Sequence, residues 1–169
     1  MVGADPWHRA GAAWHRFREV LGVKRDPALV RLSRDHHKAL AVALALRRAE
    51  DVGAAAARFG EFWREHGNAH FRVEEDVLFP AWTEAGEGYR EKLVLRALRE
   101  HHLIRSDARR VLAGQADLAL LRELGERLDA HVRFEERELF AAIERSLSRE
   151  QLDRLADEVE RAEGAARGG

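Results

Sequence analysis

The sequence lacks cysteine and contains little proline, and both absences narrow what the chain can be. Without a cysteine there is no disulfide, no thiolate-bound zinc, no iron–sulfur cluster and no thiol catalysis. With only three prolines in 169 residues, long helices meet few interruptions. No apolar run approaches the ~20 residues of a membrane-spanning helix, and the N-terminus carries no signal-peptide pattern. We therefore expect a cytoplasmic protein with no membrane partner.

An excess of charge of one sign is also lacking. The chain has 29 basic and 30 acidic residues, for a net charge of −1, and no basic tract stands out. Bulk electrostatics therefore give no reason to expect a nucleic-acid partner. Hydrophobic residues make up 46% and charged residues 35% of the chain, which is typical of helices with one apolar face and one charged face.

The hydrophobic pattern predicts an all-α protein, because apolar residues recur at steps of three and four and strand-like alternation is rare. Four long helices are expected over residues 27–51, 54–85, 89–113 and 117–146. Short links between long helices are typical of an antiparallel four-helix bundle. The expected divisions are an N-terminal amphipathic helix with its link over 1–26, the bundle over 27–147, and a C-terminal helix with a frayed tail over 148–169.

Two of these helices place histidines among their inward-facing apolar residues. The stripe expected on the first helix comprises Leu29, Leu32, Leu40 and Leu44, and that on the third comprises Val94, Leu98, Ile104 and Ala108. His36 falls within the first stripe and His37 at its edge, so we favour His36 as the inward residue. His101 takes the equivalent place on the third helix.

One ten-residue stretch occurs twice, and it dominates the functional interpretation. Residues 70–79 (HFRVEEDVLF) return as residues 131–140 (HVRFEERELF), with six identical positions. Each copy carries a His and a Glu four residues apart, His70 with Glu74 and His131 with Glu135, so both project from one helix face. About thirty residues before each copy stands an acid followed by two histidines, in residues 35–37 and 100–102.

These side chains predict a metal centre rather than a structural cluster. Four buried imidazoles and two buried carboxylates would be costly in a dry core without a cation. Six donors are too many for one structural zinc ion, whereas two ions sharing bridging carboxylates would use them all. Iron fits imidazole and carboxylate ligands best, with manganese and zinc as open alternatives.

The ordered pattern of His, His-x-x-x-Glu, His and His-x-x-x-Glu resembles the hemerythrin-like, or HHE cation-binding, family, over about residues 29–147. The resemblance implies a non-haem di-iron centre, with an oxo or hydroxo bridge between the irons and Glu74 and Glu135 as bridging ligands. The implied metal ligands are His36, His70, Glu74, His101, His131 and Glu135. It also implies a small-molecule partner, namely dioxygen, peroxide or nitric oxide. Peroxide breakdown is one version of this function, and a metal-stabilised interaction bundle or an iron-handling protein is the alternative. The oligomeric state is left open.

The chain departs from the oxygen-carrying hemerythrins at one position. Those proteins have a further histidine one turn after that of the third helix, where this chain has Arg105. A plain oxygen-carrier role is therefore not favoured. His37, His66 and His102 are candidates for an additional nitrogen, but for each a surface position or a hydrogen bond to a ligand is favoured over direct ligation. From their angles on the helices, most of Glu75, Glu136 and Glu138 are expected to turn toward solvent or neighbouring arginines, on a charged outer face.

Overall fold

Every regular element in the described part of the chain, residues 25–84 and 89–168, is a helix in the computed structural model. The elements are α2 (Pro27–Arg47), α3 (Val52–Phe62), η1 (Trp63–Gly67), α4 (Asn68–Val73), η2 (Glu74–Leu78), α5 (Phe79–Thr83), α6 (Tyr89–Leu112), α7 (Leu118–Phe134), η3 (Glu135–Leu139), α8 (Phe140–Ser146) and α9 (Arg149–Gly168). The three η elements are single π-helical turns, and each joins two α-helices into one continuous rod. The predicted all-α class is confirmed, whereas the helix expected within residues 1–26 falls almost wholly outside the described residues.

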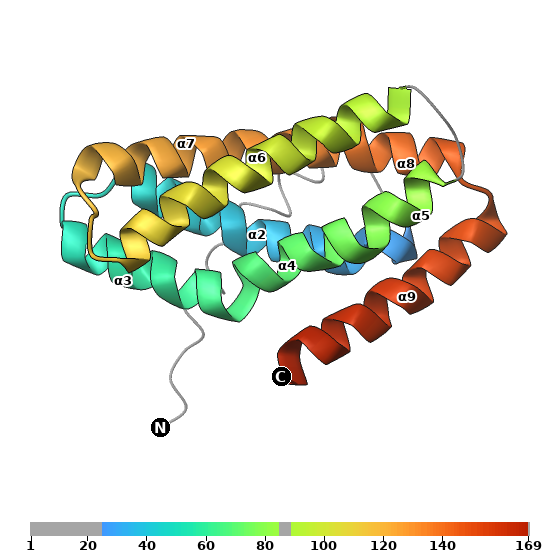
Figure 1. Ribbon diagram of the computed structural model, residues 1–169, viewed down its shortest axis with the longest axis horizontal. Coiled ribbons are helices and arrows are strands. Elements are labelled where there is room, and N and C mark those ends of the chain that lie inside the picture. Colours follow the sequence, from blue (N-terminus) through green and yellow to red (C-terminus); the bar gives the residue numbers. More distant parts are fainter. Residues whose placement is uncertain (1–24, 85–88, 169) are drawn as a thin grey trace.

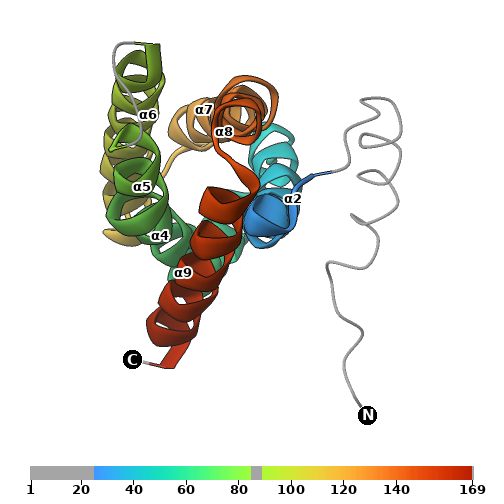
Figure 2. The ribbon, with the colours of Figure 1, turned by 90° about the vertical axis from the view of Figure 1, so that its right-hand side faces the viewer.

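The helical rods lie side by side along the long axis of the molecule (Figure 1). They are formed by α2, by α3–α5, by α6 and by α7–α8, and α9 crosses beside them, packed against α2 and α4 (Figure 2). This arrangement is consistent with a helical bundle, and the antiparallel order of its members remains a prediction. Within the described residues, no helix combines the length and the apolar character that crossing a bilayer would require.

Local sequence accounts for where several helices begin. Asp26, Asp51 and Asp117 each accept a hydrogen bond from a backbone N–H of the following turn, and thereby cap α2, α3 and α7. A capping box opens α9, because Ser148 and Gln151 each accept a hydrogen bond from the other's backbone N–H. These caps fix where α2, α3, α7 and α9 begin.

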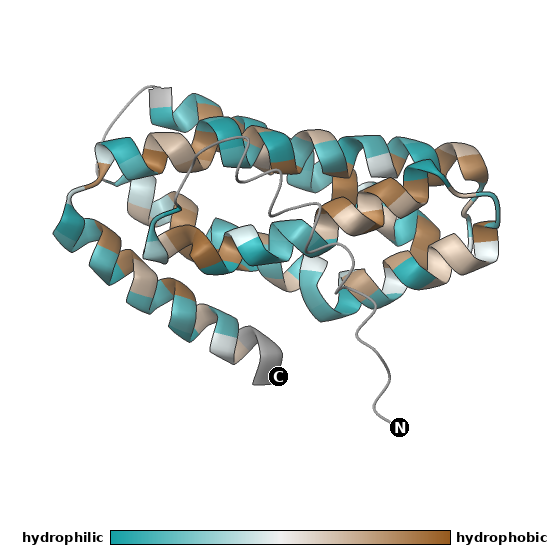
Figure 3. Cartoon of the chain, turned by 180° about the vertical axis from the view of Figure 1, so that it is seen from behind, coloured by the Kyte–Doolittle hydropathy of each residue, from teal (hydrophilic) through white to brown (hydrophobic). Residues whose placement is uncertain are grey.

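The apolar core is split into two clusters. One contains Leu29, Leu32, Phe79, Trp82, Phe140 and Leu155, and the other contains Val42, Leu46, Phe59, Ile104, Leu121 and Leu124. On each rod, the change from one cluster to the other occurs at the histidine, or between the histidine and the glutamate, of the repeated pattern. The polar layer that results is enclosed by apolar side chains on both sides, and every helix shows alternating hydrophobic and hydrophilic bands (Figure 3).

Two residues expected on inner faces are exposed instead. Leu44 is 45% and Leu98 is 37% accessible, so these predictions were wrong. On α2 the buried positions after His36 are Ala39, Val42, Ala43 and Leu46. Ala43 of α2 packs against Gly125 of α7, where an added Cβ would stand 2.7 Å from the carbonyl oxygen of Ala43. The buried face of α2 therefore runs through Ala39, Ala43 and Leu46, and Leu44 lies off it.

Candidate metal centre

Six side chains from four rods meet in the polar layer, and each is at most 7% exposed. They are the residues expected from the sequence: His36 from α2, His70 from α4, Glu74 from η2, His101 from α6, His131 from α7 and Glu135 from η3. Their donor atoms form two groups, within each of which all atoms lie within 4.8 Å of one another. One group comprises His36, His70, Glu74 and Glu135, and the other comprises His101, His131, Glu74 and Glu135.

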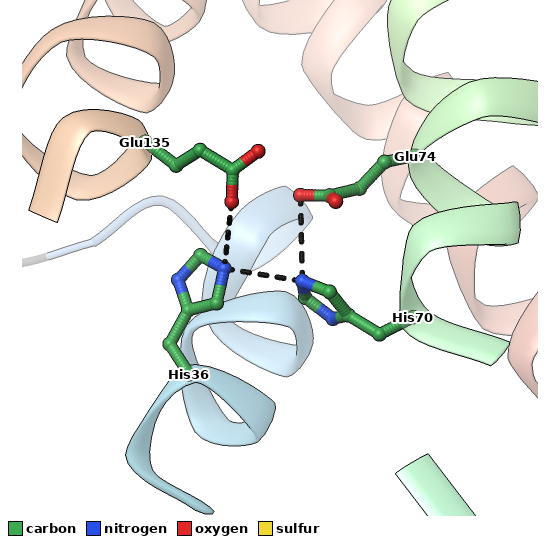
Figure 4. A group of neighbouring side chains, drawn as sticks. All are labelled: His36, His70, Glu74 and Glu135. Carbon is green, nitrogen blue, oxygen red and sulfur yellow. Dashed lines mark hydrogen bonds and ion pairs between the residues drawn. The ribbon is translucent and has the colours of Figure 1, made fainter. Parts of the chain in front are cut away.

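Figure 4 shows the first of these groups, in which the imidazoles of His36 and His70 face the carboxylates of Glu74 and Glu135. The Nε2 atom of His36 lies 3.1 Å from Glu135 Oε2 and 3.1 Å from Nε2 of His70. His70 Nε2 lies 3.4 Å from Glu74 Oε1. Ligand atoms bound to one metal at ~2.0–2.2 Å stand about 3 Å apart, so these spacings suit a shared cation.

The second group repeats this geometry with the other two imidazoles. His101 Nε2 lies 3.3 Å from Glu74 Oε2 and 3.6 Å from Glu135 Oε1. His131 Nε2 lies 3.3 Å from Glu135 Oε2. Both carboxylates therefore lie between the two pairs of imidazoles, which is where ligands bridging two ions would have to stand.

The donor atoms at the middle of the site have few partners of their own. All four carboxylate oxygens of Glu74 and Glu135 are buried without a hydrogen-bond partner among the described residues, as are the Nε2 atoms of His101 and His131. Burying so many unsatisfied polar atoms together costs several kcal/mol unless something binds them. A cation would use these lone pairs and compensate the negative charge, so the donor set fits a metal.

The outward-facing Nδ1 atoms of three of the imidazoles contact further carboxylates. His36 Nδ1 lies 2.7 Å from Glu136. His101 Nδ1 lies 2.7 Å from Glu75. His131 Nδ1 lies 2.9 Å from Glu100. The expectation of a charged outer face was therefore wrong for Glu75 and Glu136, although each contacts an arginine as expected. Glu138, at 52% side-chain exposure, does lie outside.

The π-helical turns explain why Glu75 and Glu136 contact imidazoles of the site. Glu74 and Glu135 each open a π turn, in which their backbone carbonyls accept from the N–H groups of Phe79 and Phe140, five residues on. A π turn contains more residues than the 3.6 of an α-helical turn, so successive side chains diverge by less than the usual ~100°. The side chain after each metal-facing glutamate is thereby kept on the inner side, where it reaches an imidazole on another rod.

The pKa values of these groups reflect a dense network of opposite charges. Burial alone would lower the pKa of His36, but the neighbouring carboxylates of Glu135 and Glu136 outweigh it and raise that pKa to about 10. Burial would raise the pKa of Glu75 and Glu136, yet the imidazole and arginine partners of each lower it to about 2. The carboxylates therefore stay ionised at neutral pH, and a metal ion would compete with protons for the imidazole nitrogens.

The remaining histidines of the bundle belong to neither group of donors. His102 is exposed, and His37 is half-buried. His66 is half-buried as well, and both its ring nitrogens lie near Lys38 Nζ, at 3.2 and 3.4 Å. It also lines a small cavity of about 10 Å³ that touches His36, His70 and His131. A cavity of this size has room for about one water-sized molecule beside the imidazoles.

Aromatic rings cover the imidazoles on the sides that face the two apolar clusters. Phe71 stacks on His101, with ring centroids 3.8 Å apart, and Phe140 stacks on His36 at 5.2 Å. These rings fix the planes of the imidazoles and keep bulk water away from the carboxylates. The site is therefore an anionic pocket shielded from bulk water, with a small cavity beside it.

A comparison with family models identifies this arrangement. The model of the hemerythrin HHE cation binding domain matches residues 28–143 of the chain. The chain belongs to this family. The match includes all six donor residues and both π turns at the site, whereas Arg25 and α9 lie beyond its limits. No curated protein and no solved structure shows significant similarity to the chain.

Membership in this hemerythrin family adds the class of ligand to what the geometry supports. The family binds cations, typically iron, and the buried His and Glu groups could hold such an ion. The resemblance read from the doubled His-x-x-x-Glu pattern is thereby confirmed.

Proposed function

We propose that the protein is a non-haem di-iron protein that binds or reacts with a small oxidant, namely dioxygen, peroxide or nitric oxide. One observation carries this proposal: the two groups of donors share both Glu74 and Glu135. Two separate sites would not require shared carboxylates, whereas two adjacent ions with bridging carboxylates would. In this proposal His36 and His70 hold one ion, and His101 and His131 hold the other.

The chain's own residues support a reactive centre more than a purely structural one. Two iron ions held there would supply the electrons and the open coordination positions that a small oxidant requires. The imidazoles and carboxylates orient the ions, while Phe71 and Phe140 exclude bulk water. The cavity beside His36 and His70 is small, which restricts the partner to a molecule of a few atoms.

Metal analysis combined with absorption spectroscopy tests the proposal. Protein purified after iron-replete expression should carry about two iron ions per chain and show the near-ultraviolet absorption of a bridged ferric pair. Stopped-flow mixing of the reduced protein with dioxygen, with hydrogen peroxide or with nitric oxide should change that spectrum. A single tightly held zinc ion, or no metal at all, would contradict a di-iron site.

The outcome with peroxide distinguishes the versions of this function. Sustained loss of hydrogen peroxide, measured by its absorbance, would make the protein a peroxide-decomposing enzyme. A single spectral change without turnover would make it a binding protein or a scavenger. Spectra that stay unchanged with all three oxidants would favour a metal that only stabilises the fold, or an iron-handling role.

A further inference from the structure

On the outer side of each imidazole of the candidate centre stands a carboxylate, and beyond the carboxylate stands a basic side chain. At His101, hydrogen bonds join the imidazole to the carboxylate and the carboxylate to the basic side chain. Glu75 Oε1 lies 2.7 Å from His101 Nδ1. Arg105 donates to both oxygens of Glu75, at 2.6 and 3.0 Å. The guanidinium of Arg105 also lies over the ring of Phe71, 5.4 Å from its centroid.

The same arrangement occurs at His36, in the other half of the repeat. Glu136 Oε1 lies 2.7 Å from His36 Nδ1 and also accepts from the hydroxyl of Ser33 at 2.6 Å. Arg25 donates to Glu136 Oε2 at 2.7 Å and lies over the ring of Phe140. Glu75 and Glu136 each directly follow a shared glutamate, so they occupy equivalent positions in the two copies of the repeat.

His131 has a third closed chain of this kind. Glu100 Oε2 lies 2.9 Å from His131 Nδ1. Arg96 donates to Glu100 Oε1 at 2.9 Å, and its guanidinium lies 3.8 Å from the ring centroid of Phe134. Three of the four imidazoles are thus held by a carboxylate that is itself held by an arginine.

The chain at His70 is the exception. Asp35 takes the place that Glu100 has in the second half, but its Oδ2 stands 4.0 Å from His70 Nδ1. That distance is too long for a hydrogen bond, and His70 Nδ1 has no hydrogen-bond partner among the described residues. On its outer side Asp35 meets Lys38, at 3.3 Å, rather than an arginine. Aspartate is one methylene shorter than glutamate, which accounts for the gap.

We infer that Glu75, Glu100 and Glu136 are positioning residues for the imidazoles, and that the two ion positions are therefore held unequally. At the position between His101 and His131, both imidazoles are held by a carboxylate at Nδ1. At the position between His36 and His70, only His36 is held in this way, so an ion there binds more weakly and exchanges faster. This inference rests on the proposed assignment of the six side chains as metal ligands.

The physical basis is the role of an acceptor behind a ligating imidazole. A carboxylate at Nδ1 fixes the tautomer with its proton on Nδ1, so that the Nε2 lone pair faces the ion. It also fixes the plane of the ring and makes the nitrogen a stronger donor. An arginine bound to the same carboxylate holds it in place with charge-assisted hydrogen bonds. His70 lacks the first of these supports, and its ring is freer to turn away from an ion.

Titration of the metal-free full-length protein with Co²⁺ tests the inference, with the visible spectrum of bound cobalt as the readout. We expect two ions to bind with unequal affinity. Replacing Glu75 or Glu100 by alanine should weaken the tighter step about 10–100-fold, the usual effect of losing such a partner. Glu136→Ala should weaken the looser step by a similar factor, whereas Asp35→Ala should change neither step by a comparable amount. Glu150→Ala, on the exposed face of α9, is the matched control.

Conservative variants separate positioning from mere folding. Glu75→Gln and Glu136→Gln keep an oxygen acceptor without the charge, so they should recover most of the affinity lost in the alanine variants. Because the imidazole then becomes a weaker donor, the reduction potential of the iron-loaded protein should shift to more positive values. A glutamine variant with a normal melting temperature and neither effect would overturn the inference, as would Asp35→Ala weakening a step as much as Glu75→Ala. Failure of the unsubstituted protein to bind two ions would instead overturn the proposed function.

Discussion

Arg105 donates hydrogen bonds from its two terminal guanidinium nitrogens to the two carboxylate oxygens of Glu75, at 2.6 and 3.0 Å. It belongs to neither group of candidate metal-binding donors. It stands one turn after His101, where oxygen-carrying hemerythrins have a further histidine. Within the described residues, no other histidine joins the two groups. The centre is therefore limited to four imidazoles, and Arg105 supports one of them through Glu75.

With one nitrogen fewer than an oxygen carrier, one iron should keep a position open to water and protons. We expect a single exposure of the reduced, iron-loaded protein to dioxygen to oxidise it irreversibly. Absorption spectra recorded before exposure, after exposure and after evacuation check this. Recovery of the reduced spectrum on evacuation over many cycles would show that the inference from the missing histidine is wrong.

Removing one donor imidazole should lower the metal content sharply. His131→Ala leaves the second group with one imidazole, and His70→Ala does the same to the first, so each should lose at least one of the two ions. His102→Ala alters an exposed histidine on α6 and should retain the full content. Elemental analysis of the three purified variants gives the answer, and equal metal loss in all of them would point to a general effect on folding.

The metal-free protein should be most stable in mildly acidic solution. The pKa of Glu136 is lowered from 4.5 to about 2, so its contribution is present above pH 4.5 and is lost as the pH falls towards 2. The pKa of His36 is raised from 6.5 to about 10, so its contribution is present below pH 6.5 and is lost as the pH rises towards 10. These two groups place the maximum between about pH 4.5 and 6.5.

Urea unfolding of the metal-free protein at a series of pH values measures this dependence. Glu136→Gln should flatten the acidic side of the curve, because the group that titrates there is gone. A stability that rises steadily from pH 6.5 to 10 would contradict the assignment of His36. Bound metal should shift the maximum upward, since metal ions displace the imidazole protons more readily as the pH rises.

The tight contact between α2 and α7 at Gly125 predicts how one added methyl group would change the stability of the protein. Gly125→Ala would place a Cβ 2.7 Å from the carbonyl oxygen of Ala43, so one helix must shift. We expect a loss of about 1–3 kcal/mol in the free energy of unfolding, measured by chemical denaturation. Gly164→Ala in α9, where an added Cβ would meet nothing within 4 Å, should instead stabilise the protein by up to ~1 kcal/mol.

The all-α class and the convergence of six His and Glu side chains could be predicted from the sequence, because both depend on regular periodicity. The doubled His-x-x-x-Glu spacing places two donors on one helix face, and the apolar stripe on α2 selects His36, at 1% exposure, over the half-buried His37. The donors lie near the middle of each stripe, which is the part that the packing of the rods covers. This reasoning needs only an unbroken α-helix.

The outer carboxylates could not be predicted, because each depends on a departure from that regularity. Glu75 and Glu136 are turned inward by π turns, which an assumed 100° per residue does not anticipate. Glu100 precedes a donor histidine, and its contact with His131 depends on how α6 sits against α7. The exposure of Leu44 and Leu98 was also mispredicted. The packing between rods, and not the apolar stripe of one helix alone, decides which residues at the edge of the stripe are buried.

Two of the carboxylates that hold imidazoles come from the opposite half of the repeat, so the two halves depend on each other. Glu75 belongs to the first half but holds His101 of the second, while Glu136 belongs to the second half but holds His36 of the first. A polypeptide carrying one half alone would supply two imidazoles and one shared carboxylate, and its Glu75 or Glu136 would have no imidazole to hold. Each half therefore depends on the other for the carboxylate behind one of its imidazoles, and neither half can hold all of its histidines in place alone.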